Sequence, residues 1–337
     1  MSTDCIRGKR LLLNRLLEPL SSDRTTTYCT GGPARRNAKA EAGRFFDVAE
    51  AVRFGDSLAA IAFEIRTVTV RPILTVLGVM LLSCLAVKSV QAEEAVLLED
   101  FDQRAKSDFY LHLNEHERLE VVSKLGVRGS QALRASYVGS KLGSDRIIVT
   151  EPLSRHLTDA TLCFDVQLEE GFKFMRGGRM HGLGPNDRAI GQRPDDPDAW
   201  CARIRFRGDG TLETSLSHQD QRANDGDRGR RVRPFKLLVG RYYAISLHVK
   251  LNDPDKSNGL TKLYINGILV EEHSDVCFRK VDSLDSEISH YMFNTFFGGG
   301  THADAPRNLD GSLTSFHALY DNLAVYEGEH IRRAAGE

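Results

Sequence analysis

The feature that most constrains this chain is a series of short apolar or alternating runs, each bounded by turn residues, between Ala95 and Tyr326. The runs predict strands at Ala95–Phe101, Ala132–Val138, Arg146–Thr150, Ala160–Leu168, Trp200–Phe206, Leu212–Ser217, Tyr242–Leu251, Thr261–Ile265, Ile268–His273, Tyr291–Phe297 and Leu313–Tyr326. Many strands at this spacing, with hardly any long helical period, are typical of two packed antiparallel sheets. The expected fold class is therefore all-β, a jelly-roll β-sandwich.

Three segments carry the clearest local signals. Tyr243–Leu251 alternates apolar and polar side chains, as a strand with one buried face does. Asn266-Gly267 lies between two strand-like runs and predicts a tight hairpin, because both residues tolerate the positive φ angles that such turns require. For Glu115–Leu125 we predict a short helix.

The composition is that of a soluble globular protein, with 41% hydrophobic residues, 27% charged residues and a net charge of −1. A chain of 337 residues could hold two domains, but the strand-rich part fits one domain at residues 93–330. The near-zero net charge argues against a nucleic-acid binder that relies on bulk positive charge. Any site for a polyanion must therefore be local.

A leader is predicted at residues 68–92, where Arg71 precedes an apolar run and Ala92 ends the segment. This anatomy is typical of a signal peptide cleaved after Ala92, which would make the protein secreted, periplasmic or attached to the cell surface. The alternatives are an uncleaved membrane anchor and a leader lipidated at Cys84, and either would be the only link to a membrane. We interpret residues 1–67 as a disordered or mis-assigned extension that the mature protein lacks.

Cysteine usage bounds the covalent and metal chemistry of the remaining chain. Cys163, Cys201 and Cys277 remain after cleavage, so at most one disulfide can form among them. There is no C-x-x-C pair and no His/Cys cluster at zinc spacing, and we predict no cofactor. A structural calcium ion is a separate hypothesis, because carboxylates lie near the first and last strands and oxygen ligands suit calcium. The carboxylates concerned are Glu99, Asp100, Asp102 and Asp321.

Two long polar stretches interrupt the predicted sheet, Gly184–Ala199 and Gln219–Arg233. We expect both to be rim loops, where binding residues tend to lie on a rigid sheet. The arginines of the second stretch fit a contact with a polyanion, and they equally fit a solvated loop whose charges are answered by Asp225 and Asp227. These arginines are Arg222, Arg228, Arg230, Arg231 and Arg233.

Four groups of residues, taken together and in this order, form a recognisable set. They are Gly177-Gly178-Arg179-Met180-His181-Gly182-Leu183, Trp200-Cys201-Ala202-Arg203, Leu263-Tyr264-Ile265-Asn266-Gly267, and Phe293-Asn294-Thr295-Phe296-Phe297-Gly298-Gly299 with Tyr320-Asp321-Asn322. This set resembles polysaccharide lyase family 14, the alginate and glucuronan lyases, over residues 95–327. The resemblance implies a jelly roll whose concave face forms an open groove for an acidic polysaccharide.

The resemblance also implies β-elimination at a uronic acid. This reaction needs groups that neutralise the C6 carboxylate, a base that removes the C5 proton and an acid that protonates the leaving O4. The family's lysine, serine, arginine and two tyrosines fall on Arg179, Cys201, Arg203, Ser215 and Ser217, so only Arg203 is unchanged. Arg179 can still bind a carboxylate, but arginine keeps its proton at ordinary pH, and the serines lack the phenol of tyrosine.

Other residues are candidates for the missing proton transfers. His181 and His218 are candidate bases, because histidine titrates near neutral pH, and Tyr291 is the candidate acid. Together with Arg179 and Arg203 on the carboxylate they form the predicted catalytic set, although each histidine also fits a structural role. The residues predicted to bind substrate are Lys173, Arg176, Cys201, Ser215, Ser217, Gln219 and Asn294.

Three classes of function stay open. The first is a secreted lyase-like protein that binds a uronate polysaccharide and cleaves it by elimination. The second is a non-catalytic carbohydrate-binding protein that keeps the groove, which the absent Tyr-x-Tyr pair favours. The third is a surface module with protein partners. Arg179, Arg203 and the glycine framework favour sugar recognition.

Overall fold

A computed structural model describes residues 94–185, 193–223 and 226–334. All described residues belong to one compact unit, Cys84–Glu337. The predicted extension at residues 1–67 and the predicted leader at residues 68–92 lie outside the described residues and stay predictions. Within the described ranges, no helix has the length and apolar character that crossing a membrane requires.

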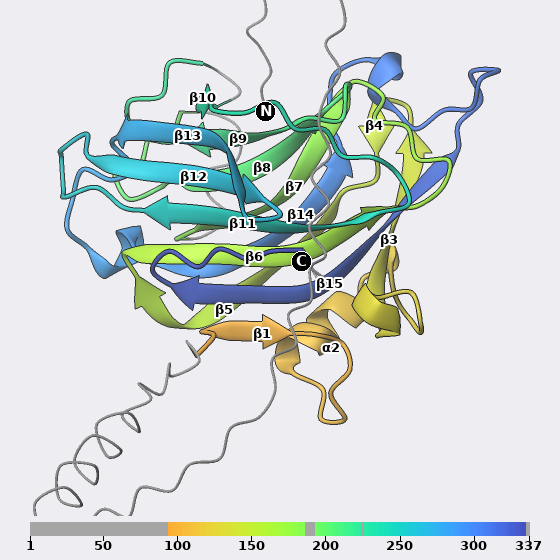
Figure 1. Cartoon of the computed structure of the whole chain (residues 1–337). Coiled ribbons are helices and arrows are strands. Elements are labelled where there is room, and N and C mark those ends of the chain that lie inside the picture. The colour runs from red at the N-terminus through yellow and green to blue at the C-terminus, as the bar shows by residue number, and fades with distance from the viewer. Residues whose placement is uncertain (1–93, 186–192, 224–225, 335–337) are drawn as a thin grey trace, which may run out of the picture. The chain divides into compact units, whose positions relative to one another are not determined.

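The described residues form a ten-stranded sheet and a five-stranded sheet, which we call the large and the small sheet (Figure 1). The large sheet has the order β10 (Arg230–Arg231), β13 (Ile268–Val276), β12 (Gly259–Ile265), β11 (Tyr242–Lys250), β6 (Asp159–Leu168), β15 (Ser315–Glu327), β3 (Ala132–Ser140) and β2 (Leu119–Val122), with β1 (Leu97–Glu99) on β15 and β4 (Gly143–Ser144) on β3. The small sheet has the order β5 (Ile147–Leu157), β14 (Ile288–Phe297), β7 (Gly177–Gly184), β8 (Cys201–Arg207) and β9 (Leu212–Ser217). The short helical elements are α2 (Asp108–Asn114), η1 (Val127–Gly129), η2 (Leu284–Ser286) and η3 (His302–Asp304). The predicted all-β sandwich of antiparallel sheets is confirmed.

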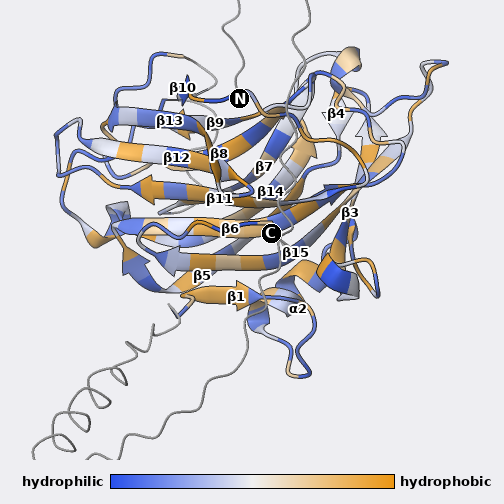
Figure 2. Cartoon of the chain, in the orientation of Figure 1, coloured by the Kyte–Doolittle hydropathy of each residue, from blue (hydrophilic) through white to orange (hydrophobic). Residues whose placement is uncertain are grey.

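The core lies between the two sheets, because each strand turns one alternating face inward. Ile245 and Leu247 of β11 are buried in the same cluster as Ala202, Ile204 and Phe206 of β8. Figure 2 shows the alternation as apolar and polar residues that follow one another along the strands. Burial of an aliphatic side chain contributes about 1.5–3 kcal/mol, so the alternation fixes which residues of β8 point away from the core.

The hairpin predicted in the large sheet is confirmed. Asn266 and Gly267 form the turn between β12 and β13, with φ angles of 52° and 79°. Trp200, just before β8 of the small sheet, is fully buried and donates a hydrogen bond of 2.8 Å to a backbone carbonyl.

The helix predicted at Glu115–Leu125 is wrong. Helix α2 ends at Asn114, and Leu119–Val122 forms strand β2, which pairs with β3. The true helix starts earlier because Ser107 caps it, accepting a hydrogen bond of 2.9 Å from the Tyr110 amide. Pairing with β3 stabilises Leu119–Val122 as a strand more than the helix-like spacing stabilises a helix, since the branched side chains of β2 pack well on a pleated sheet.

Strand β7 is absent from the strands that the sequence predicted. It lies in the middle of the small sheet, between β14 and β8. A register shift between Arg179 and Gly182 does interrupt its pairing with β8. The glycine-rich segment is therefore both a strand and the place of a bulge.

The carboxylates considered for calcium accept hydrogen bonds from the protein. Glu99 accepts from the Phe101 amide at 2.8 Å, and Asp321 accepts from the Val127 amide and the Ser130 hydroxyl, both at 2.8 Å. In the described part of the chain no three potential ligands of the His, Cys, Asp or Glu type converge as a metal site would require. The first and last strands do pair, but calcium stays a prediction that this geometry does not support.

The three cysteines of the described part are buried. They are Cys163, Cys201 and Cys277, and no disulfide joins any two of them. The expectation of at most one disulfide among them therefore agrees with the structure.

Candidate anion-binding site

The outer face of the small sheet, which points away from the core, carries a row of side chains across four strands. Phe296 of β14 lies opposite Arg179 of β7, Arg179 opposite Arg205 of β8, and Arg205 opposite Glu213 of β9. Residues directly opposite in antiparallel strands project to the same face. The sheet therefore brings two arginines and one carboxylate into a line.

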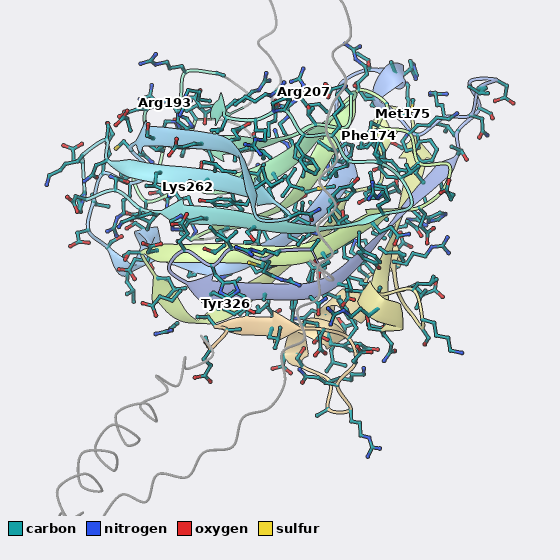
Figure 3. The ribbon with its side chains drawn as sticks, in the orientation of Figure 1. Phe174, Met175, Arg193, Arg207, Lys262 and Tyr326 are labelled. Carbon is teal, nitrogen blue, oxygen red and sulfur yellow. The ribbon has the colours of Figure 1, made fainter. Side chains whose placement is uncertain are left out.

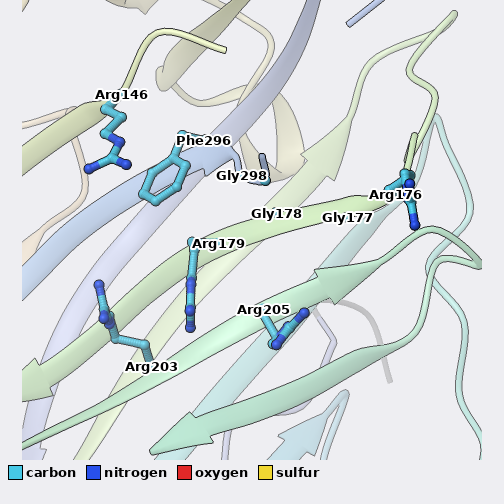
Figure 4. Close-up of a pocket in the computed structure, with 10 residues that line it drawn as sticks. Arg146, Arg176, Gly177, Gly178, Arg179, Arg203, Arg205, Phe296 and Gly298 are labelled. Atoms are coloured by element: carbon cyan, nitrogen blue, oxygen red, sulfur yellow. The ribbon is translucent and has the colours of Figure 1, made fainter. Parts of the chain in front are cut away.

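A pocket of about 370 Å³ opens on this face (Figure 4). Its lining residues are Arg146, Arg176, Gly177, Gly178, Arg179, Arg203, Arg205, Phe296, Gly298 and Gly299. Five arginines thus line one pocket, and the side chains of Arg146, Arg179 and Arg203 lie around the same space in Figure 4. Guanidinium groups at this density attract anions, and their planar N–H donors match carboxylates.

Arg203 departs most from ordinary packing. Its exposed fraction is 1%, and its Nε has no hydrogen-bond partner. No carboxylate of the described residues forms an ion pair with it. A buried cation without a counter-charge is costly, because the lost hydration is not replaced. Since Arg203 lines the pocket, an anion that entered would supply the missing charge.

Two neighbouring arginines are held in place by other groups. Arg179 donates a hydrogen bond to Ser215 Oγ. The Arg146 guanidinium lies over the ring of Phe296, 5.1 Å from its centroid, in a cation–π contact. Both contacts orient their guanidinium groups at the pocket that they line.

Gly182 of β7 makes room for Arg203. A Cβ atom on Gly182 would lie 2.4 Å from Arg203 Cγ and 2.4 Å from the carbonyl oxygen of Ala202. We expect Gly182→Ala to lower the free energy of unfolding by about 1–3 kcal/mol, because the backbone at Ala202 cannot yield cheaply. Urea unfolding measures the loss. The control is Gly300→Ala, since a Cβ there would meet nothing within 4 Å, and equal stabilities of the two variants would contradict this account.

His181 lies on the core side of the small sheet, away from the pocket. It is fully buried, with the rings of Phe164, Phe293 and Tyr320 at centroid distances of 4.7, 4.1 and 4.6 Å. Burial lowers the pKa of His181 to about 3. Strict alternation would put His181 on the face of Arg179, but the register shift that follows Arg179 reverses it. The structure therefore does not place this candidate base in the pocket.

Tyr291 also faces the core, where its ring is 5.3 Å from that of Phe109. It is fully buried, and burial raises its pKa well above the ordinary value. The structure does not place this candidate acid in the pocket either. The physical reason is again the register, because Tyr291 is paired with the inward-facing Leu183 of β7.

His218 follows the end of β9 and belongs to a separate hollow. Its Nε2 lies 3.1 Å from Asp227 Oδ2, and its ring is 6.1 Å from the ring of His273. The hollow is lined by His218, Asp220, Arg222, Asp227, Arg228, Ser257, His273, Ser274 and Asp275. None of these residues lines the arginine pocket, so His218 is not positioned as a base for an anion bound there.

Four predicted substrate-binding residues are buried in or directly after β8 and β9 and do not line the pocket. Cys201, Ser215 and Ser217 share the outer face of the small sheet through the pairing of β8 with β9. Gln219 donates hydrogen bonds of 2.8 and 3.0 Å to two backbone carbonyls, so it serves the structure of the loop. Of this group, Ser215 touches a pocket residue, Arg179.

The three other predicted contacts have different environments. Arg176 lies at the rim of the pocket, with an exposed fraction of 63% and its Nε 3.8 Å from Asp304. Asn294 is buried, and its Oδ1 has no hydrogen-bond partner among the described residues. Lys173 is exposed and does not line the pocket.

Leaving the lining glycines aside, the prediction from the sequence missed three lining residues: Arg146, Arg205 and Phe296. Arg205 could have been found, because it alternates with Arg203 along one predicted strand and so shares its face. Arg146 and Phe296 meet because β5 pairs with β14, and no local signal reveals that pairing.

The fold and the pocket define an antiparallel β-sandwich with an arginine-lined pocket on the outer face of one sheet. A family profile, polysaccharide lyase 14, matches residues 136–312, which is more than half of the chain. The chain therefore belongs to the polysaccharide lyase 14 family. A search of curated proteins found no match.

Solved structures of lyases share the fold. The chain is similar to alginate lyase Aly36B, with 20% identity, a TM-score of 0.54, and coverage of 69% of this chain and 98% of that one. It is also similar to the marine PL-14 alginate lyase from Aplysia kurodai, with 18% identity, a TM-score of 0.50, and coverage of 69% and 99%. An Aly36B variant in complex with alginate trisaccharide matches with 21% identity, a TM-score of 0.50, and coverage of 59% and 82%. These likenesses confirm the predicted fold, and the chemistry of the site must be argued from this chain's own residues.

The segment after β9 occupies space beside Ser215, where the resemblance led us to look for a tyrosine. A Cβ atom on Gly226 would lie 2.7 Å from Ser215 Oγ. Asp227 exchanges two backbone hydrogen bonds of 2.9 Å with Leu216, which fixes this segment along the edge of β9. A tyrosine at position 215 would have to displace the segment, so a small side chain fits this position.

The described lining of the pocket has no His, Tyr, Asp, Glu or Lys side chain. Arginine stays protonated in proteins and cannot act as a general base near neutral pH. The pocket can therefore neutralise a carboxylate and hold it by paired N–H donors, but this lining offers no group that accepts a proton.

Proposed function

We propose that this protein binds an acidic polysaccharide through its uronate carboxylates, in the arginine pocket of the small sheet. The observation that carries the proposal is Arg203, a buried cation that lines the pocket without an acidic partner. A guanidinium binds a carboxylate by two parallel hydrogen bonds, and the low local dielectric strengthens them. Arg146 and Arg179 flank the same space, so the carboxylate would be met from more than one side.

Family membership makes a uronate polymer the first ligand class to test. One similar solved structure, an Aly36B variant, is a complex with alginate trisaccharide, and for that reason we choose alginate as a probe. A secreted location would bring this protein to such polymers, and it stays a prediction from the leader.

Cleavage by β-elimination is the second candidate, and family membership favours it. The pocket meets the first need of that reaction, because its arginines would neutralise the C6 carboxylate and acidify the C5 proton. The proton transfers need an acid and a base. The described lining of the pocket has no side chain that could act as either near neutral pH. We therefore place binding before cleavage.

The test is to measure binding and ultraviolet absorbance on the same samples, with alginate, glucuronan and neutral dextran as probes. We expect the protein to bind at least one uronan and not dextran, with an affinity that falls as salt screens the arginines. A rising absorbance from the conjugated elimination product would add cleavage to binding. The absence of binding to every uronan in low salt would overturn the proposal.

A further inference from the structure

The outer face of the small sheet is covered at one end and open at the other. Along β8, Cys201 and Arg203 are each 1% exposed. Farther along the same face of this strand, the side chains of Arg205 and Arg207 are 21% and 43% exposed. Arg203 lines the pocket and Cys201 does not. The pocket therefore ends at Arg203, at the covered end of the face.

A segment before β8, residues 193–199, closes the covered end. Ala199 packs with Cys201 and Met292 in an apolar cluster that is separate from the core between the sheets. Gln219 donates hydrogen bonds of 2.8 and 3.0 Å to two backbone carbonyls of the same segment, which ties it to the end of β9. A ligand cannot continue along the strands beyond the buried arginine unless it displaces this segment.

The segment after β9 closes a second side of the pocket. Ser215 lies opposite Arg203 on β9 and is 2% exposed. Gly226 lies against this serine, since a Cβ atom on Gly226 would be 2.7 Å from Ser215 Oγ. Asp227 fixes the segment through its two backbone hydrogen bonds with Leu216. A ligand that reaches the buried arginine therefore cannot cross β9 either.

The opposite end of the pocket is open. Arg146 is exposed, and the side chain of Arg176 is 63% exposed. Arg176 follows Phe174 and Met175, and Figure 3 labels both beside Arg207, the last residue of β8. A ligand therefore enters from this end, and its leading group stops at the buried arginine.

We infer that the pocket receives the end of a uronate chain and not its interior. This inference rests on the proposed function and refines its ligand from a uronate polymer to the terminal sugar of such a polymer. The terminal carboxylate reaches Arg203, the most deeply buried cation of the pocket, and the rest of the chain leaves past Arg146 and Arg176. A chain bound by its interior has to run on in two directions from that carboxylate, and the closed sides leave it one.

The experiment measures by calorimetry how much protein a fixed mass of alginate or glucuronan binds at saturation, before and after partial hydrolysis of the same polymer. Hydrolysis that multiplies the chain ends about tenfold leaves the mass unchanged, whereas sites along a chain scale with its mass. We expect the amount of wild-type protein bound to rise by the same factor as the number of ends. An amount that stays constant would overturn the inference.

The absorbance of the same samples shows whether the protein shortens the polymer during the titration. If it does, the lengths of the products become the readout. Recognition of chain ends predicts that the shortest oligosaccharides are released from the start, while the viscosity of the polymer falls slowly. A fast fall in viscosity with products of mixed length would overturn the inference.

Arg203→Met connects the measurement to the closed end of the pocket. We expect this variant to lose affinity about 100-fold for the intact and the hydrolysed polymer alike. Arg241→Met is the control, because Arg241 is exposed and does not line the pocket, and it should keep the wild-type response to hydrolysis. Unchanged binding of the intact polymer to Arg203→Met would place the chain outside the pocket and also overturn the inference. If wild-type protein bound neither polymer sample, the proposed function itself would fail, which is a different outcome.

Discussion

Arg203→Met is expected to make the protein more stable and at the same time unable to hold a uronate. The guanidinium of Arg203 is buried without a carboxylate partner among the described residues, and methionine fills a similar volume without a charge. We expect the free energy of unfolding to rise by about 1–4 kcal/mol, the gain seen when buried charges are replaced by apolar groups. Urea unfolding measures this gain.

The affinity of the same variant should fall about 100-fold, because removing one partner of a buried charge pair costs about 2–5 kcal/mol. Calorimetry with a uronate oligosaccharide measures the loss. Arg241→Met is the control, because Arg241 is exposed and does not line the pocket. A gain in stability together with a loss of affinity would show that Arg203 serves binding at a cost in stability. A gain in stability with unchanged affinity would show that the ligand binds elsewhere. A loss of stability would show that interactions within the folded protein offset the cost of burying the Arg203 charge.

The architecture could be predicted because alternation is a local property of the chain. The strand predicted at Leu212–Ser217 coincides with β9, and the hairpin at Asn266-Gly267 needs only its own two residues. The same alternation along β8 places Arg203 and Cys201 on one face, as the resemblance to the family had implied.

The interior of the site could not be predicted because it depends on pairings between distant segments. His181 turns inward through a register shift in β7 that alternation cannot reveal. Arg146 meets Phe296 through the pairing of β5 with β14. Glu213 gathers Arg228 from a loop whose path the sequence leaves open. Each case adds a contact that no spacing within one segment encodes.

His181→Leu is expected to stabilise the protein, and more strongly in acid. Neither ring nitrogen of His181 has a hydrogen-bond partner among the described residues, and aromatic rings surround it. An unsatisfied buried polar group costs about 1–3 kcal/mol, so an apolar side chain of similar size should remove that cost. At pH 7.5 we expect the melting temperature to rise by several degrees.

The pH dependence of stability distinguishes two causes of the expected gain: removal of an unsatisfied buried histidine, and better packing of leucine. Burial lowers the pKa of His181 in the folded protein to about 3, from an ordinary value of 6.5 that applies in the unfolded chain. Between these values the unfolded state binds more protons than the folded state, so acidification favours unfolding. The contribution of His181 to stability should therefore fall by about 2 kcal/mol between pH 6.5 and pH 4.5, and the leucine variant should lack this component.

The measurement is urea unfolding of wild type and His181→Leu at both pH values, and the decisive quantity is the difference between the two proteins. Other groups titrate as well: burial raises the pKa of Asp321 to about 6, for example, which acts in the opposite direction. Because both proteins contain Asp321, its effect cancels in the difference. His302→Leu, at an exposed position, should keep the pH dependence of wild type. If the stability difference between wild type and His181→Leu did not widen in acid, His181 would have to be hydrated or already protonated in the folded state, and its assignment to the dry core would be wrong.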